Sequence, residues 1–283
     1  MKIAQYRESG RTRLGLVSDE ALTPCTFTGD LIDLIEQRVD PTAAGSTVPL
    51  ERVELAPTVT RPSKIIAIGL NYMDHVRESK GTVPEAPLVF AKFPSSLAAH
   101  GAALTWDPAV TAKVDFEAEL AVIVGREASW IPEEKALDAV FGYTCANDVS
   151  ARDLQFGDGQ WVRGKSLDTF CPLGPWVVTA DEVPDPHDLD IRCRVNGTIM
   201  QESRTDQMIF RIPGLLSYLS RHFTLLPGDV ILTGTPHGVG AFREPSVYLQ
   251  NGDEVIVEIE RIGALANACR TLSRTGEPLP EPA

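Results

Sequence analysis

The chain of 283 residues is 43% hydrophobic and 23% charged, which is the composition of a globular protein with a sizeable core. Its formal net charge of −13 argues against a surface built to bind nucleic acid or an anionic membrane. We therefore expect neither a nucleic acid nor a membrane as a partner.

Cysteine usage and the lack of long apolar runs predict a cytoplasmic protein. The five cysteines are scattered and never form a C-x-x-C pair, which is typical of reduced, packed thiols rather than a disulfide frame or a zinc site. No stretch approaches the ~20 apolar residues that a membrane span needs, and the N-terminal residues contain no signal-peptide core.

The first sixty residues predict a small N-terminal α/β domain. Its expected elements are strands over 1–7, 13–18 and 53–57 and a helix over 29–37. The polar, proline-bearing connector 56–63 marks the boundary between this domain, residues 1–60, and a catalytic domain of residues 61–283.

The remainder of the chain is rich in strands. Apolar runs bounded by Gly, Pro, Asp or Asn predict strands over 64–70, 88–93, 120–125, 176–180, 191–201, 229–234 and 253–260. Within one of them, Asn196-Gly197 predicts a type I′ hairpin. Helical patterns cover 132–140 and 211–222. Because strands outnumber helices and do not alternate with them, we expect an α+β, mostly β fold and exclude a doubly wound sheet.

Residues 114–124, VDFEAELAVIV, place three carboxylates on one face of a predicted strand. Asp115, Glu117 and Glu119 share this face without an interleaved Lys or Arg, and the same face then becomes apolar. One interpretation is a solvated edge. The other is a pair of ligands, Glu117 and Glu119, for a hard cation such as Mg²⁺ or Mn²⁺, with Asp115 structural.

Asp148 is the candidate third ligand. It opens a stretch in which Arg152 and Gln155 follow at i+4 and i+7, so a helix that begins near Asp148 aligns the three side chains. The alternative is that Asp148 caps this helix and that Arg152 is its exposed ion-pair partner.

Lys165 lies in a segment, 159–176, dense in aromatic residues, Gly and Pro. An ammonium presented to a pocket there stabilises an oxyanion or an enolate. The alternative is a lysine whose charged end reaches solvent from a loop.

His75 and Glu78 are spaced i and i+3 after the predicted strand 64–70. On a helical turn they form a dyad in which the carboxylate orients an imidazole base. The hydrophilic segment 80–87 that follows has the composition of a mobile lid. The alternative is a contact at the protein surface.

The Gly- and Thr-rich turn within residues 227–240 is a candidate anion-binding element. It contains neither the phosphate-loop pattern nor a correctly spaced G-x-G-x-x-G, so a nucleotide site is excluded. Its backbone N–H groups and the Thr235 hydroxyl fit a carboxylate instead.

Five blocks in this order resemble the fumarylacetoacetate hydrolase family. They are RPSKIIAIGLNYMDHVRES, DFEAELAVIVG, GYTCANDVSARDLQ, RGKSLDTFCPLGPW and GDVILTGTPHGVG, and the resemblance extends over residues 61–271. It implies a mixed β-sandwich or roll with a small N-terminal domain. It also implies a homodimer and a divalent metal, commonly Mg²⁺, Mn²⁺ or Ca²⁺.

The resemblance also assigns roles to individual residues. The family's metal ligands match Glu117, Glu119 and Asp148, its lysine matches Lys165, its substrate-orienting residues match Arg152 and Gln155, and its water-activating pair matches His75 and Glu78. One departure is His237, at a position in the Gly-rich turn where similar proteins often carry a small residue.

The leading hypothesis is a hydrolase of the acylpyruvate type, which cleaves a carbon–carbon bond in a 2,4-diketo acid. The metal chelates the 2-keto carboxylate and His75 activates water, while Lys165 stabilises the enolate that departs. An isomerase or tautomerase and an oxaloacetate decarboxylase are alternatives that use the same site. A non-catalytic metal-binding scaffold is the alternative from another class.

Overall fold

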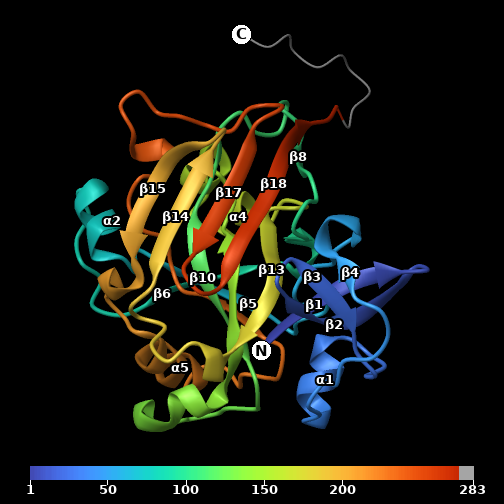
Figure 1. Cartoon of the computed structure of the whole chain (residues 1–283). Coiled ribbons are helices and arrows are strands. Elements are labelled where there is room, and N and C mark those ends of the chain that lie inside the picture. Colours follow the sequence, from blue (N-terminus) through green and yellow to red (C-terminus); the bar gives the residue numbers. More distant parts are fainter. Residues whose placement is uncertain (274–283) are drawn as a thin grey trace.

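A computed structural model describes residues 1–273 of the chain as a mostly β protein (Figure 1). The largest of its three sheets has the order β4-β3-β2-β1-β13-β11-β10-β16-β5-β6, and β7 also pairs with β13. Its eleven strands are β1 (Lys2–Glu8), β2 (Arg11–Ser18), β3 (Ala21–Pro24), β4 (Val48–Pro49), β5 (Ile65–Gly69), β6 (Leu88–Lys92), β7 (Leu97–Ala98), β10 (Ala118–Val124), β11 (Val140–Asn147), β13 (Cys171–Thr179) and β16 (Val230–Leu232).

A five-stranded sheet lies in front of the large sheet in Figure 1. In sheet order its strands are β15 (Thr198–Arg204), β14 (Asp190–Val195), β17 (Glu254–Ile259), β18 (Gly263–Thr271) and β8 (Leu104–Trp106). The third sheet consists of β9 (Val114–Asp115) and β12 (Ser150–Ala151).

Helices are short. They are α1 (Leu31–Gln37), α2 (Met73–Glu78), α3 (Arg152–Gly157), α4 (Val162–Lys165) and α5 (Ile212–Ser220), with 3₁₀ segments at Leu50–Arg52, Pro94–Ser96, Glu133–Ala139, Ala180–Glu182, Thr205–Gln207 and Gly240–Phe242. No helix within residues 1–273 is long and apolar enough to cross a membrane.

Strand β10 separates two hydrophobic cores. Leu120 and Val122 belong to the core that extends under the five-stranded sheet, whereas Ala121 and Ile123 belong to a second core on the opposite face. Both faces are therefore covered, and every residue of β10 is buried. This burial explains why its sequence becomes apolar at every position after Glu119.

The N-terminal segment extends the large sheet. Strand β1 pairs antiparallel with β13, where Ile3 lies opposite Val177. Helix α1, which begins with an Asp30–Asp33 capping box, packs its apolar face into the second core. The domain boundary at residue 60 stays a prediction.

Most predicted elements are present, and the exceptions have local causes. Asn196 and Gly197 both have positive φ, as a type I′ hairpin between β14 and β15 requires. The predicted strand 53–57 is reduced to a single bridge from Leu55 to Tyr6. The same edge of β1 pairs with β13 at Lys2 and Ile3. In place of the predicted helix 132–140 the structure has a 3₁₀ segment, Glu133–Ala139. Val140, the last residue of the predicted helix, is the first residue of β11.

Among the strands that were not predicted, β11 and β18 are the longest. Strand β18, GALANACRT, is rich in Ala and has few residues that favour strands. Strand β11, VFGYTCAN, does contain such residues, but Gly142 interrupts them. Their place in the sheets depends on the neighbours that they pair with. All five cysteines are free thiols, and four of them are buried, as predicted.

Gly142 in β11 provides a test of the sheet that carries the site. A Cβ at this position would lie 2.3 Å from the carbonyl oxygen of Val178, so Gly142→Ala must separate β11 from β13. We expect this variant to lose about 1–3 kcal/mol of unfolding free energy, measured by urea denaturation. Gly157→Ala is the matched control, because a Cβ there meets nothing within 4 Å. Equal stability of the two variants would contradict the packing described here.

Candidate metal centre

Three buried carboxylates converge beside β10. Glu117, Glu119 and Asp148 each offer one oxygen, and these oxygens all lie within 4.8 Å of one another. The pairing of β10 with β11 sets this arrangement: the Glu117 N–H donates to Asn147 Oδ1 at 2.9 Å, and the Asp148 N–H donates to the Glu117 carbonyl at 2.9 Å. The solvated-edge interpretation of this face is therefore wrong.

Asp148 is not a helix cap. Helix α3 begins at Arg152 after Ala151, which makes no side-chain cap, and the intervening β12 pairs with β9. The predicted helix start near Asp148 is wrong for the same reason. The Asp148 carboxylate is instead shared between the ammonium groups of Lys92 and Lys165.

Two cations hold Glu117. Lys165 Nζ lies 2.7 Å from Glu117 Oε2 and 2.7 Å from Asp148 Oδ2. Arg152 contacts Glu117 Oε1 at 2.7 Å and donates to Gln155 Oε1 at 2.9 Å. Both cationic side chains are almost fully buried, so a solvated lysine and an exposed Arg152 are both excluded.

Asp115 has a structural role. It accepts from Arg152 Nε at 2.8 Å, from the Gly240 N–H at 2.7 Å and from the Ala241 N–H at 2.9 Å. These bonds attach the turn that follows β16 to the acidic strand. Asp115 is not one of the three convergent carboxylates.

Glu117 and Glu119 have opposite electrostatic environments. Burial alone would raise the pKa of Glu117, but Lys165 and Arg152 outweigh it and lower this pKa to about 2. Burial, together with the charges of Asp148 and Glu117, raises the pKa of Glu119 well above its usual range. Glu119 is therefore the carboxylate whose charge the surrounding side chains compensate least.

The donor set fits a divalent metal. Within residues 1–273, the one hydrogen bond that Glu119 accepts comes from the Gly234 N–H at 2.7 Å. Lys92, Arg152 and Lys165 balance the charges of Asp115, Glu117 and Asp148, so ionisation of Glu119 leaves one negative charge without a cation. Carboxylate oxygens are the donors that Mg²⁺, Mn²⁺ and Ca²⁺ prefer, and the cluster can hold such an ion.

His75 and Glu78 form the predicted pair on α2. His75 Nδ1 lies 3.0 Å from Glu78 Oε2, and Glu78 Oε1 accepts from the Gly238 N–H at 2.8 Å. His75 is 6% exposed, which excludes a contact at the protein surface. In the tautomer that carries its proton on Nδ1, Glu78 accepts this proton and Nε2 keeps a lone pair.

These groups meet at a cavity of about 220 Å³. Its polar lining consists of His75, Ser79, Glu117, Glu119, Arg152, Gln155, Lys165 and Thr235, and its aromatic lining of Phe90, Phe156, Trp161 and Phe242. The structure thus brings together the predicted site residues. Glu78 and Asp148 do not line the cavity themselves. Glu78 contacts the lining residue His75, and Asp148 belongs to the carboxylate cluster with Glu117 and Glu119.

Residues 64–270 match the family model described as Fumarylacetoacetate (FAA) hydrolase C-terminal. The chain belongs to the fumarylacetoacetate hydrolase family. Enzymes of this family act on small keto acids.

Relatives carry the names of several reactions. The chain is 48% identical to a mitochondrial oxaloacetate tautomerase of Bos taurus over 222 aligned residues. These residues are 78% of this chain and 70% of that protein. A fumarylacetoacetate hydrolase from psychrophilic Exiguobacterium antarcticum is 37% identical with a TM-score of 0.89, covering 96% of this chain and 100% of that one. A 2-hydroxyhepta-2,4-diene-1,7-dioate isomerase from Mycobacterium marinum is 33% identical with a TM-score of 0.82, covering 98% and 100%. These neighbours confirm the predicted fold.

His237, the departure from the family pattern, lies outside the cavity. Its side chain is 46% exposed, and Nε2 lies 3.1 Å from the Glu202 carbonyl oxygen. Thr235 is the residue of this turn that lines the cavity, and its hydroxyl accepts from Gln201 Nε2 at 2.8 Å.

Sequence reasoning missed Lys92, Gln201 and Phe242. Lys92 is fully buried against Asp148, and Gln201 fixes Thr235. The Phe242 ring packs at a tilt against His75, with 5.7 Å between ring centroids. One signal was available: Lys92 is a lone charge at the end of the otherwise apolar strand LVFAK.

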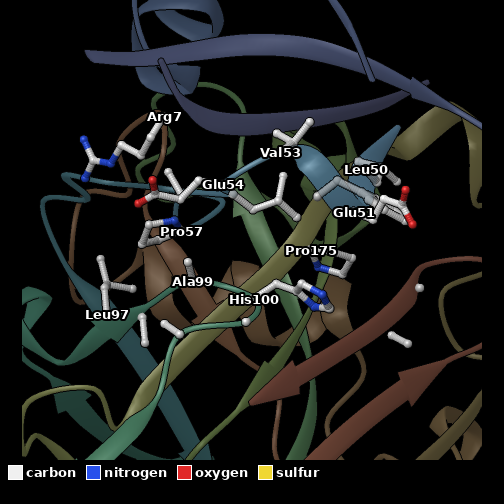
Figure 2. Close-up of a pocket in the computed structure, with 18 of the residues that line it drawn as sticks. Arg7, Leu50, Glu51, Val53, Glu54, Pro57, Leu97, Ala99, His100 and Pro175 are labelled. Carbon is white, nitrogen blue, oxygen red and sulfur yellow. The ribbon is translucent and has the colours of Figure 1, made fainter. Parts of the chain in front are cut away.

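A larger cavity lies elsewhere. A cavity of about 900 Å³ lies between the N-terminal segment, with Arg7 and Glu54, and the stretch that holds Leu97 and His100 (Figure 2). None of the three convergent carboxylates lines it. The chemistry of the lining, rather than volume, identifies the site in this family member.

Glu119 predicts a pH dependence of stability after metal removal. An unfolded glutamate titrates near pH ~4.3. Because folding raises the pKa of Glu119, the unfolding free energy in EDTA decreases as the pH rises from about 4.3 through the folded-state pKa. Glu119→Gln should remove this component and weaken Mn²⁺ binding.

Urea denaturation in EDTA between about pH 5 and 8 measures this effect. The loss of stability with rising pH should be smaller for Glu119→Gln than for the wild type. The exposed Glu85 provides the control, because Glu85→Gln should keep the wild-type slope. If the unfolding free energy of all three proteins changes equally with pH, the raised pKa of Glu119 in the folded protein is refuted.

Proposed function

We propose that the protein is a divalent-metal-dependent enzyme that interconverts the keto and enol forms of a small 2-keto acid, with oxaloacetate as the first candidate substrate. One observation carries this proposal: Lys165 and the carboxylate cluster meet His75 across a cavity of only about 220 Å³. The tautomerase name of a relative with 48% identity supports this choice of substrate.

Glu117, Glu119 and Asp148 are the proposed ligands, for Mg²⁺ or Mn²⁺, with Ca²⁺ as a further candidate. When bound, the metal supplies a Lewis acid that polarises the 2-keto carbonyl. Arg152, Gln155 and Thr235 line the same cavity and provide donors for the substrate carboxylate and carbonyl groups.

Lys165 is suited to stabilise the enolate. Burial disfavours its charged form, but Asp148 and Glu117 outweigh this effect and raise the pKa of Lys165. The side chain therefore remains an ammonium at neutral pH. It donates a hydrogen bond to the oxygen on which negative charge develops.

His75 is the proposed base. Its Nε2 accepts a proton from the carbon beside the carbonyl, while Glu78 holds Nδ1–H and the imidazole orientation. The carbon–hydrogen electron pair becomes the carbon–carbon double bond of the enol, and the enolate oxygen then takes up a proton. The product is an isomer of the substrate, so no co-reactant is required.

Hydrolysis of a 2,4-diketo acid is a second candidate, favoured by the His75–Glu78 pair. His75 would take a proton from water, the water oxygen would bond to the distal carbonyl carbon, and the carbon–carbon bond would break. Its electron pair would leave as an enolate that Lys165 stabilises before protonation. Decarboxylation of oxaloacetate also passes through an enolate and is a third outcome.

We also propose that the protein is cytoplasmic and forms a homodimer.

Metal removal tests the proposed chemistry directly. Protein treated with EDTA should lose turnover of oxaloacetate, and Mg²⁺ or Mn²⁺ should restore it. Enol absorbance reports tautomerisation, and pyruvate formation from oxaloacetate or from acylpyruvates reports decarboxylation or hydrolysis. If no 2-keto acid is converted with any of these metals, the scaffold alternative is correct.

His75→Ala tests the base. Loss of a positioned base should lower the rate by about 10²–10⁴-fold, while Mn²⁺ affinity is kept because His75 is not a carboxylate ligand. His237→Ala is the matched control, since this exposed side chain lies outside the cavity. Wild-type rates for His75→Ala on every substrate would refute the assignment.

A further inference from the structure

Lys92 is a second buried lysine in the carboxylate cluster, and it has no place in the mechanism above. It is the last residue of β6, and its side chain is 0% exposed. Unlike Lys165, it does not line the 220 Å³ cavity. Lys92 is therefore screened from the substrate and acts through other residues.

The Lys92 ammonium uses all three of its N–H groups on one small region. It donates to Asp148 Oδ1 at 2.6 Å, to the Val149 carbonyl at 3.3 Å and to the Lys165 carbonyl. An ammonium has three donors, so its hydrogen-bonding capacity is used completely. Each acceptor belongs either to the metal-ligand segment or to the residue that carries the catalytic ammonium.

These contacts fix the carboxylate of Asp148. Lys92 holds Oδ1 and Lys165 holds Oδ2, at 2.6 and 2.7 Å. Rotation of the carboxylate would break both ion pairs in a region without access to water. By holding Oδ1, Lys92 therefore determines that Oδ2 of Asp148 faces Lys165.

Lys92 also fixes the main chain of Lys165. Helix α4 has only four residues, and no side chain caps its start. At its end, the Lys165 carbonyl accepts from Lys92, and the next hydroxyl, Ser166 Oγ, accepts from the Phe93 N–H at 3.0 Å. Two consecutive residues of one chain segment thus clamp the end of α4.

We propose that Lys92 is a positioning residue, which locks the ligand Asp148 and the enolate-stabilising Lys165 into one geometry. The proposal rests on the metal-dependent function proposed above. Residues that orient metal ligands from outside typically contribute 10–100-fold to metal affinity or activity. A role in charge balance alone would have the opposite sign, because removal of a cation strengthens the attraction of the cluster for Mn²⁺.

Lys92→Met is the test variant and Lys64→Met is its matched control. Lys64 pairs with the buried carboxylate of Asp229 at 2.5 Å, away from the cluster, so both changes remove a lysine from a buried aspartate. Mn²⁺ affinity and the spectrum of bound Mn²⁺ are measured by electron paramagnetic resonance. Oxaloacetate turnover is measured in parallel.

We expect Lys92→Met to raise the Kd for Mn²⁺ by about 10–100-fold, to alter the spectrum of the bound ion and to lower kcat, whereas Lys64→Met stays within about twofold of the wild type. Unchanged or tighter Mn²⁺ binding would overturn the positioning role. If circular dichroism shows that Lys92→Met is unfolded, Lys92→Gln, which keeps N–H donors, is judged by the same criteria. A wild-type protein that neither binds Mn²⁺ nor converts a 2-keto acid would overturn the proposed function as well.

Discussion

Charge compensation around Asp115, Glu117, Glu119 and Asp148 determines much of the local structure. A buried carboxylate is costly unless cations or N–H groups satisfy it, and these four lie at the edge of two hydrophobic cores. The chain meets this requirement with cations from three separate segments, β6, α3 and α4. Segments far apart in sequence are thereby fixed around one point.

The same requirement organises the turn after β16. Backbone N–H groups of this turn donate to Glu119, Glu78 and Asp115 through Gly234, Gly238 and Gly240. At Gly234 and Gly238 the φ angles are positive, and a Cβ at Gly238 would lie 2.2 Å from the Met200 carbonyl oxygen. Glycine is needed there because other residues rarely adopt these φ angles and because a Cβ at Gly238 would collide with the Met200 carbonyl.

The sequence was sufficient for the mostly β fold class and for the residues around the cavity, because alternation and turn residues are local signals. It did not reveal β11 or the Ala-rich β18, whose positions are defined by their partners across the sheet. It also misplaced Asp148 at a helix start, since the two-residue β12 between Asp148 and α3 depends on pairing with β9. Lys92 escaped notice because nothing within its own strand identifies the distant aspartate that it contacts.

The lysine between two of the proposed ligands has a consequence for how the protein matures. Because Lys165 and Arg152 already neutralise Glu117, and Lys92 and Lys165 already neutralise Asp148, the polypeptide can complete its folding before any ion arrives. Binding of a divalent ion would then be a separate, later event at a preformed pocket. The identity of the resident ion would follow the supply of divalent cations around the finished protein, not the conditions under which its chain was made.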